Sequence, residues 1–293
     1  MTIAWGESHR YDTGDLNAIA LDNNGNAVEV HVGSIKLYCR VGKVDFAQKT
    51  IAWGESVQYD GGEYGVFDGP NAVALDNKGN VIEVHTVDSL GLCYRVGKAD
   101  FTKRTITWGK KHAYDSGNSN AVALDNNGNA VEVHVGSDRL YYRVGKVDFA
   151  KQTIAWGESR EYDTGGPNAI ALEDNGRAVE VHVGSNKLYY RVGNVDFAQQ
   201  TIAWGESLRY DTGGPNTVAL DNGDAVEVHV GSNKLYYRVG KVDFAQQTIA
   251  WEESLRYDTG GPNAVALSEG KAVEVHVGSN KLYYRVGNVG SGS

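Results

Sequence analysis

The sequence predicts an all-β fold, a six-bladed β-propeller with four antiparallel strands in each blade. The six tryptophans lie 47–48 residues apart, except for one interval of 55 residues, which an insertion at Gly61–Pro70 lengthens. Each repeat contains four short extended runs separated by turn residues. The 37 glycines and 17 tyrosines also favour strands and turns.

The fifth repeat shows the four runs in order. Asn216–Leu220 (NTVAL) is short and carries small side chains, so we expect it to be the innermost strand. Ala225–Val230 (AVEVHV) alternates apolar and polar residues, as a strand does. Lys234–Val239 (KLYYRV) is rich in β-branched and aromatic residues, and Thr248–Ser254 (TIAWEES) carries the tryptophan. Asn-Gly and Gly-Ser-Asn-Lys segments between the runs are typical of hairpin turns.

The order of the runs predicts how the ring closes. The chain begins with a fourth run, Thr2–Tyr11, and ends with a third run, Lys281–Val289, so we expect Thr2–Tyr11 to complete the sixth blade. An open solenoid or a β-sandwich is the alternative fold. A single domain is expected over residues 1–289, with 290–293 as a linker or tag remnant. Its repeat units lie at about 17–59, 71–114, 120–162, 168–210, 216–257 and 263–289 plus 2–11.

A Glu-x-His pair recurs in the second run of every unit. Residues i and i+2 of a strand share a face, so each glutamate and histidine lie together. The Tyr/Arg face of the third run is expected beside them, with the tryptophan nearby, and the pattern predicts a Glu–Arg ion pair. The candidate site residues are Glu29, His31, Arg40, Trp53, Glu83, His85, Arg95, Trp108, Glu132, His134, Arg143, Trp156, Glu180, His182, Arg191, Trp204, Glu227, His229, Arg238, Trp251, Glu274, His276, Arg285 and Trp5.

Geometry argues against a shared metal ion and against catalysis. The histidines belong to the second strand, at least about 4.8 Å outside an open central ring. They cannot converge within the roughly 2 Å that one ion requires. Glycosidases use two carboxylates in one cleft, whereas each unit repeats a single glutamate. We therefore expect no catalytic residue, no metal and no cofactor. The segment Asp22–Asn26 (DNNGN) lacks EF-hand spacing and is interpreted as a hairpin turn.

Net charge and composition limit the classes of partner that the protein is expected to bind. The net charge of −9 argues against a nucleic-acid or anionic-membrane partner. No apolar run has the length of a membrane span, so membrane insertion is not expected. The first residues, MTIAWGESHRYDTG, lack the pattern of a secretory signal, which predicts a cytoplasmic location or export by a non-classical route. Cys39 and Cys93 are predicted to be free thiols.

The repeat resembles known modules. The pattern W-G-E-S-x-x-Y-D-x-G, followed by V-A-L, V-E-V-H-V and L-Y-Y-R-V-G, is similar to repeats of bacterial and fungal secreted proteins, some attached to lipase-like or toxin-like domains. The predicted architecture also resembles propeller lectins of the tachylectin-like and fucose-binding types. In six-bladed fucose lectins, pockets between blades use Arg, Glu and an aromatic residue. This resemblance implies Arg40, Glu29 and Trp53 in the first unit.

Two functions remain open. The first is a multivalent carbohydrate-binding protein, or lectin, whose partners are glycans or glycoconjugates bound at or between blades. The six-fold repetition of a polar and aromatic cluster suits this function, because weak sites on a rigid ring gain avidity. The second is a non-catalytic interaction or targeting scaffold, such as a toxin-associated module or a consensus-type engineered propeller. In that case the Glu/His/Arg stripe is purely structural.

Overall fold

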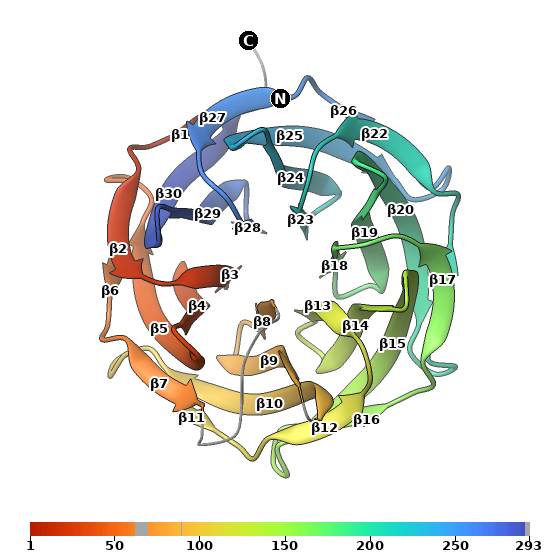
Figure 1. Ribbon diagram of the computed structural model, residues 1–293, viewed down its shortest axis with the longest axis horizontal. Helices are drawn as coiled ribbons and strands as arrows, with labels where there is room; N and C mark the ends of the chain where they lie inside the picture. Colours follow the sequence, from red (N-terminus) through yellow and green to blue (C-terminus); the bar gives the residue numbers. More distant parts are fainter. Residues whose placement is uncertain (62–69, 89, 291–293) are drawn as a thin grey trace.

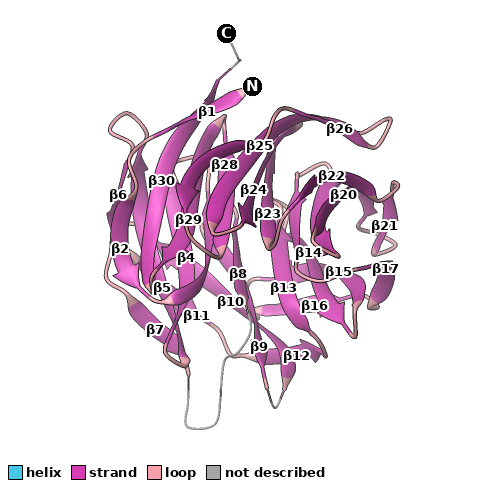
Figure 2. Ribbon diagram, turned by 45° about the horizontal axis from the view of Figure 1, so that its top comes forward, coloured by secondary structure: helices cyan, strands magenta, loops and turns pink. Residues whose placement is uncertain are grey.

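Six antiparallel sheets stand around a central axis, which confirms the predicted six-bladed propeller (Figure 1). The computed structural model describes residues 1–61, 70–88 and 90–290, so most of the insertion after Gly61 lies outside the described residues. Within these ranges every regular element is a strand (Figure 2). The same ranges hold no helix that is long and apolar enough to cross a membrane.

The first three blades follow one another along the chain. The first blade comprises β3 (Asp15–Leu21), β4 (Asn26–Gly33), β5 (Lys36–Asp45), β6 (Thr50–Trp53) and β7 (Val57–Asp60). The second comprises β8 (Asn71–Leu75), β9 (Asn80–Val87), β10 (Gly91–Asp100), β11 (Thr105–Trp108) and β12 (His112–Asp115). The third comprises β13 (Asn118–Leu124), β14 (Asn129–Gly136), β15 (Arg139–Asp148), β16 (Thr153–Trp156) and β17 (Arg160–Thr164).

The remaining blades repeat this order. The fourth comprises β18 (Asn168–Leu172), β19 (Arg177–Gly184), β20 (Lys187–Asp196), β21 (Thr201–Trp204) and β22 (Leu208–Thr212). The fifth comprises β23 (Asn216–Asp221), β24 (Asp224–Gly231), β25 (Lys234–Asp243), β26 (Thr248–Trp251) and β27 (Leu255–Thr259). The sixth comprises β28 (Asn263–Ser268), β29 (Lys271–Gly278), β30 (Lys281–Gly290), β1 (Thr2–Trp5) and β2 (His9–Thr13).

The fourth strand position of each blade is shared by two short strands. In the first blade both β6 and β7 pair with β5, and a register shift separates Leu37 from Tyr38. Gly42 lies opposite Trp53, where a Cβ atom would come within 2.6 Å of the indole ring. Glycine is needed at this position because the tryptophan ring lies across the third strand.

The N-terminal segment closes the ring as predicted. Thr2 pairs with Gly290 and Trp5 with Gly287, so β1 forms the outer edge of the sixth blade. β2 continues along the same edge of β30. In Figure 1 these first strands lie beside the last long strand of the chain. Pairing the two ends of the chain in one sheet removes the open edges that a solenoid would expose.

The turns follow the local sequence. In the Gly-Ser-Asn-Lys turns both central residues have positive φ, for example 54° at Ser185 and 59° at Asn186, as in a type I′ turn. In the DNNGN turn the Asp22 carboxylate accepts hydrogen bonds from the backbone N–H of Asn24 and Asn26. The aspartate thus caps its own turn, in agreement with the hairpin interpretation.

The hydrophobic core is divided among the interfaces between blades. Where the sixth blade meets the first, Val273, Val275 and Tyr284 pack against Ile19 and Ile51. The other interfaces repeat this packing. Residues at the starts of the six inner strands, among them Ala18, Ala72 and Ala264, line a central cavity of about 260 Å³. Each blade therefore buries its apolar face only when the next blade is present.

In five of the six blades a buried tyrosine joins the apolar face to the following blade. The Tyr284 hydroxyl accepts a hydrogen bond from the backbone N–H of Ile51 at 3.1 Å. Tyr94, Tyr142, Tyr190 and Tyr237 make the equivalent bond. In the first blade Cys39 occupies this position, and it is buried and free, as is Cys93. The interface between the first and second blades therefore differs chemically from the others.

Ring closure can be tested by moving the first strands. We expect deletion of residues 1–13 to expose the edge of β30 and to cause self-association and loss of a cooperative thermal transition, because an unpaired edge templates further pairing. As a control, residues 2–13 are attached after Gly290 through a copy of Phe244–Gln247, the linker that the fifth blade uses. This permutant should regain a monomeric, cooperative fold. Equal stability of the deleted and full chains, by calorimetry and light scattering, would contradict the role of β1 and β2.

Candidate functional site

The Glu-x-His pairs lie buried between blades. Glu29 is fully buried, and His31 is only 1% exposed. The His31 Nδ1 atom lies 3.0 Å from a carboxylate oxygen of Glu29. The same contact measures 2.9–3.0 Å in the other five blades. The sequence prediction that these two side chains share a strand face is therefore confirmed.

The preceding blade supplies a second partner for the glutamate. The hydroxyl of Tyr11, on β2 of the sixth blade, donates to Glu29 of the first blade at 2.9 Å. Asn17 in turn donates to the Tyr11 hydroxyl. Three further interfaces show the Tyr–Glu bond at 2.8–2.9 Å. Burial and the neighbouring glutamate raise the pKa of all six of these tyrosines, so the hydroxyls stay protonated as donors.

The predicted Glu–Arg ion pair is wrong. Glu29 and Arg40 are opposite each other in the β4–β5 register, but Arg40 Nε donates to Asp12 of the preceding blade at 2.7 Å. Its Nη1 donates to the carbonyl of Gly54, at the break between β6 and β7. The long arginine side chain extends outward to these acceptors, whereas the shorter glutamate stays with histidine and tyrosine. The Arg–Asp distance is 2.7–2.9 Å in all six interfaces.

Together these residues form what we call the cross-blade cluster: Tyr and Asp of one outer strand with Glu, His and Arg of the next blade. The aspartate was absent from the sequence-based candidates. The sequence feature that could have identified this aspartate is the Tyr-Asp dipeptide, which recurs in every unit, at Tyr11-Asp12 and at five further positions. Sequence reasoning missed it because the dipeptide belongs to the unit before the one it contacts.

The charged side chains of the cluster stabilise the ionised forms of its histidine and aspartate. Burial favours neutral histidine, yet the carboxylates of Glu29 and Asp12 raise the pKa of His31. The pKa of His182, His229 and His276 is raised for the same reasons. The imidazolium form donates from Nδ1 to glutamate and directs Nε2 toward aspartate, 3.7 Å away in the case of Asp12. Burial opposes ionisation of Asp12 too, but the Thr13 N–H and Arg40 lower its pKa.

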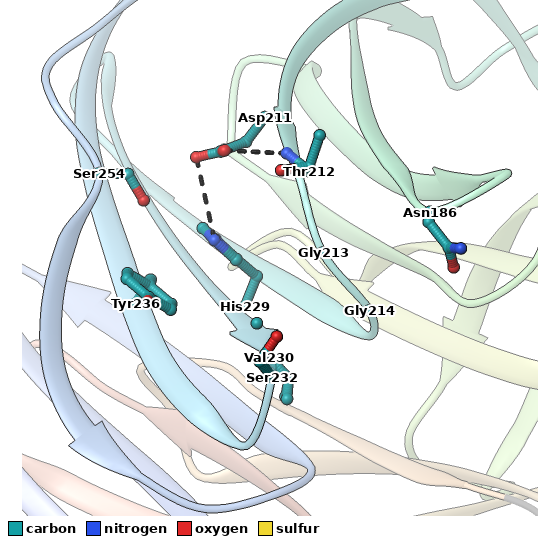
Figure 3. Close-up of a pocket in the computed structure, with 11 residues that line it drawn as sticks. Asn186, Asp211, Thr212, Gly213, Gly214, His229, Val230, Ser232, Tyr236 and Ser254 are labelled. Atoms are coloured by element: carbon teal, nitrogen blue, oxygen red, sulfur yellow. Dashed lines mark hydrogen bonds and ion pairs between the residues drawn. The ribbon is translucent and has the colours of Figure 1, made fainter.

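Above the cluster lies an open cavity, which we call the interblade pocket. Between the fourth and fifth blades it measures about 660 Å³ and is lined by Asp211, His229, Tyr236, Ser254 and Asn186, together with backbone of the adjoining turns (Figure 3). An equivalent pocket of about 650 Å³ lies between the sixth and first blades. Its matching residues are Asp12, His31, Tyr38, Ser56 and Asn280.

Each interblade pocket combines an aromatic ring with polar groups. The Tyr236 and His229 rings are stacked, with centroids 5.4 Å apart and planes 10° apart. Figure 3 shows His229 directed toward Asp211, which also accepts hydrogen bonds from the backbone N–H of Thr212 and from Arg238. The tyrosine, the aspartate and the serine were not sequence-based candidates. Of the predicted residues, only the histidine lines these two pockets.

The predicted tryptophans and glutamates take part in packing between blades and do not line the two interblade pockets. Trp53 stacks on Tyr11 of the preceding blade, with ring centroids 5.4 Å apart, and meets Tyr284 edge-on. Glu227 is fully buried and does not line the pocket above it. Within residues 1–61, 70–88 and 90–290, no three His, Cys, Asp or Glu side chains are grouped so that they could hold a metal ion.

Comparison with known proteins supports the fold. No family model matches the sequence, and no curated protein matches it. The structure is similar to a sialidase of Trypanosoma rangeli in complex with the inhibitor DANA, with a TM-score of 0.62 and 12% identity over 95% of this chain and 55% of that chain. The chain thus spans about half the length of that sialidase.

Two other solved structures are comparable. A protein from Lactobacillus plantarum matches with a TM-score of 0.60 and 16% identity, over 93% of this chain and 80% of that one. A chain of a nidogen/laminin complex matches with a TM-score of 0.52 and 12% identity, over 86% of each chain. At these identities the likeness shows the propeller fold alone.

The cluster predicts which side chain matters most for stability. We expect Glu227→Ala to cost about 3–5 kcal/mol, because it breaks a fully buried charged pair. Arg238→Ala should cost less, about 1–3 kcal/mol, because Asp211 keeps the hydrogen bond from the Thr212 N–H and is reached by water. Urea unfolding of both variants measures the difference. A larger loss for Arg238→Ala would show that arginine, and not histidine and tyrosine, stabilises the glutamate.

The cluster also predicts the pH dependence of stability. The lowered pKa of the six aspartates means that their contribution is complete above pH 3.8 and is lost as the pH falls below that value. The raised pKa of His31, His182, His229 and His276 means that their contribution is complete below pH 6.5 and is lost as the pH rises through the folded pKa. Stability should therefore peak between these limits. Histidine NMR titrations giving pKa values below 6.5 would contradict this.

Proposed function

We propose that the chain is a multivalent, non-catalytic carbohydrate-binding protein whose sites are the interblade pockets. The observation that carries this proposal is the pairing of a stacked tyrosine with an aspartate, a serine and an asparagine in an open cavity of about 650 Å³, found at two interfaces. Cavities of roughly 300–1,000 Å³ are typical of small-molecule sites. The proposed sites are between blades, as in the sequence-based hypothesis, but they use largely different side chains.

The chemistry of the pocket suits sugar hydroxyl groups. Asp211 offers carboxylate oxygens, and Ser254 and Asn186 each offer both donor and acceptor groups. The Tyr236 ring supplies an apolar surface for the C–H face of a sugar ring. The formal charges of Asp, Arg, His⁺ and Glu in the cluster cancel. A neutral sugar therefore fits better than a strongly charged ligand.

The arrangement of carboxylates supports binding without hydrolysis. Hydrolysis of a glycosidic bond ordinarily requires two carboxylates that flank that bond. In the pocket between the fourth and fifth blades only Asp211 brings a carboxylate to the lining, while Glu227 is fully buried. The pocket between the sixth and first blades adds Asp15, where the other pocket has Gly214, so a pair of carboxylates is not common to the two pockets. The solved sialidase structures are named as enzymes, including one in complex with sialic acid, but at 12% identity they supply no catalytic residue to this chain.

A non-catalytic interaction scaffold is the second candidate. The observation that favours it is the self-sufficiency of the cross-blade cluster: each glutamate is bonded to histidine, and each arginine to aspartate and a backbone carbonyl. The recurrence of Glu and Arg can therefore be explained without a ligand. The pocket rim is better explained by a ligand, because the packing of blades does not require Tyr, Ser and Asn to surround an open cavity.

Binding can be tested on a glycan array, followed by calorimetry with methyl α-D-mannoside, methyl β-D-galactoside, methyl α-L-fucoside and N-acetylglucosamine. We expect millimolar or tighter binding to at least one sugar, with several sites per chain. Tyr236→Ala should remove one site because it deletes the aromatic surface, whereas Tyr236→Phe should keep it. An empty array, with no heat from any sugar, would favour the scaffold.

A further inference from the structure

One of the six interfaces departs from the others at the tyrosine and serine positions of the pocket rim. Between the first and second blades, the equivalents of tyrosine, serine and asparagine are Cys93, Lys111 and Ile35. The aspartate and histidine are retained there as Asp60 and His85. The residues that hold the blades together are thus preserved, while those that shape the cavity are replaced.

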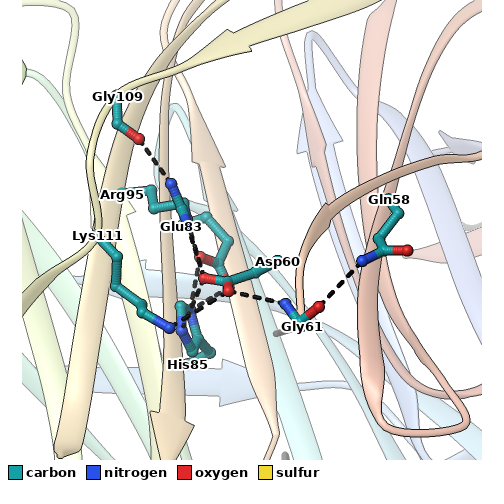
Figure 4. A network of polar contacts seen from close by, with 8 residues as sticks. All are labelled: Gln58, Asp60, Gly61, Glu83, His85, Arg95, Gly109 and Lys111. Carbon is teal, nitrogen blue, oxygen red and sulfur yellow. Dashed lines mark hydrogen bonds and ion pairs between the residues drawn. The ribbon is translucent and has the colours of Figure 1, made fainter. Parts of the chain in front are cut away.

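Lys111 lies against the aspartate of this interface. Its Nζ atom is 3.3 Å from Oδ1 of Asp60, while Arg95 binds the other oxygen at 2.9 Å. Figure 4 shows both cations directed at the same carboxylate from two sides. The Asp60 side chain is 7% exposed, whereas the five equivalent aspartates are 16–19% exposed. The lysine therefore occupies one oxygen of a carboxylate that is less exposed than its five equivalents.

The tyrosine that stacks on the histidine is also replaced at this interface. In the other five, a tyrosine stacks on the histidine with centroids 5.4–5.5 Å apart and planes within 13°. Cys93 takes the tyrosine position and is completely buried, so it presents no ring to the cavity. Among the residues that the structure describes, this interface therefore lacks the stacked tyrosine that the other five share.

We propose that the chain has five carbohydrate sites rather than six, and that Lys111 closes the pocket between the first and second blades by occupying the place of a ligand on Asp60. This inference rests on the proposed function. A neutral hydroxyl cannot displace an ammonium group from a carboxylate that is largely shielded from water, because the charged hydrogen bond is stronger. At the closed interface the aspartate is therefore bonded to side chains of the protein and binds no sugar.

The stoichiometry of sugar binding tests the proposal. Native mass spectrometry at saturating concentrations of the same four sugars should count five bound molecules on the wild-type chain. The triple variant Lys111→Ser, Cys93→Tyr and Ile35→Asn rebuilds the rim found between the fourth and fifth blades and should bind six. Six sugars on the wild-type chain, or five on a folded triple variant, would overturn the proposal.

The reverse change provides a matched control at an intact interface. Ser254→Lys with Tyr236→Cys copies the closed rim onto the pocket between the fourth and fifth blades and should reduce the count from five to four. If it still binds five, Lys111 and Cys93 do not explain closure. Thermal unfolding of each variant shows whether it is folded. Absence of binding by every variant would overturn the proposed function and this inference with it, whereas a count of six overturns this inference alone.

Discussion

The buried glutamate of each blade is the constraint on which the rest of the structure depends. Glu29 has no contact with water, so its charge must be compensated within the protein. Its own blade provides His31, but the Tyr11 hydroxyl comes from the preceding blade. A single blade therefore leaves this charge incompletely bonded, and stacking completes it. The N-terminal strands contribute twice, because β2 completes the sheet of the sixth blade and also carries Tyr11 and Asp12 to the first blade.

The sequence was sufficient to predict the features of the fold that depend on the repeat period and on the alternation of apolar and polar residues. Strand order, hairpin turns and ring closure follow from local patterns, and the structure confirms them. The partner of Arg40 could not be obtained this way. Glu29 is its direct neighbour across the β4–β5 pair, yet the acceptor is Asp12, which belongs to the previous unit. Strand pairing determines which backbones are adjacent, but side-chain length and the break in the outer strand decide which charges meet.

Trp53 shows the same limit for aromatic residues. A tryptophan beside polar residues suggests a sugar-binding surface, but this ring lies across Gly42 and stacks on Tyr11 of the adjacent blade. The repeated glycine opposite the tryptophan was the local sign of its structural role. The ring that does face the pocket is Tyr38, at the first position of the Tyr-Tyr pair in the third strand. The second position of that pair is occupied by Cys39 in this blade. Alternation along the strand separates the two positions, so only the first reaches the pocket.

The six interfaces also show which residues can change independently. Tyr, Asp, Glu, His and Arg of the cross-blade cluster are present in all six, while the rim residues differ between the first and second blades. Removing a cluster residue exposes an unpaired charge, whereas replacing a rim residue alters only the cavity. Under the proposed function, a sugar bound to Asp211 and Tyr236 contacts two blades at once. Binding then strengthens the contact that holds the ring together, by about 2.7 kcal/mol per site when the sugar is at 100 times its Kd. A ring whose stability depends on contacts between neighbours should therefore become markedly more stable when several sites are filled.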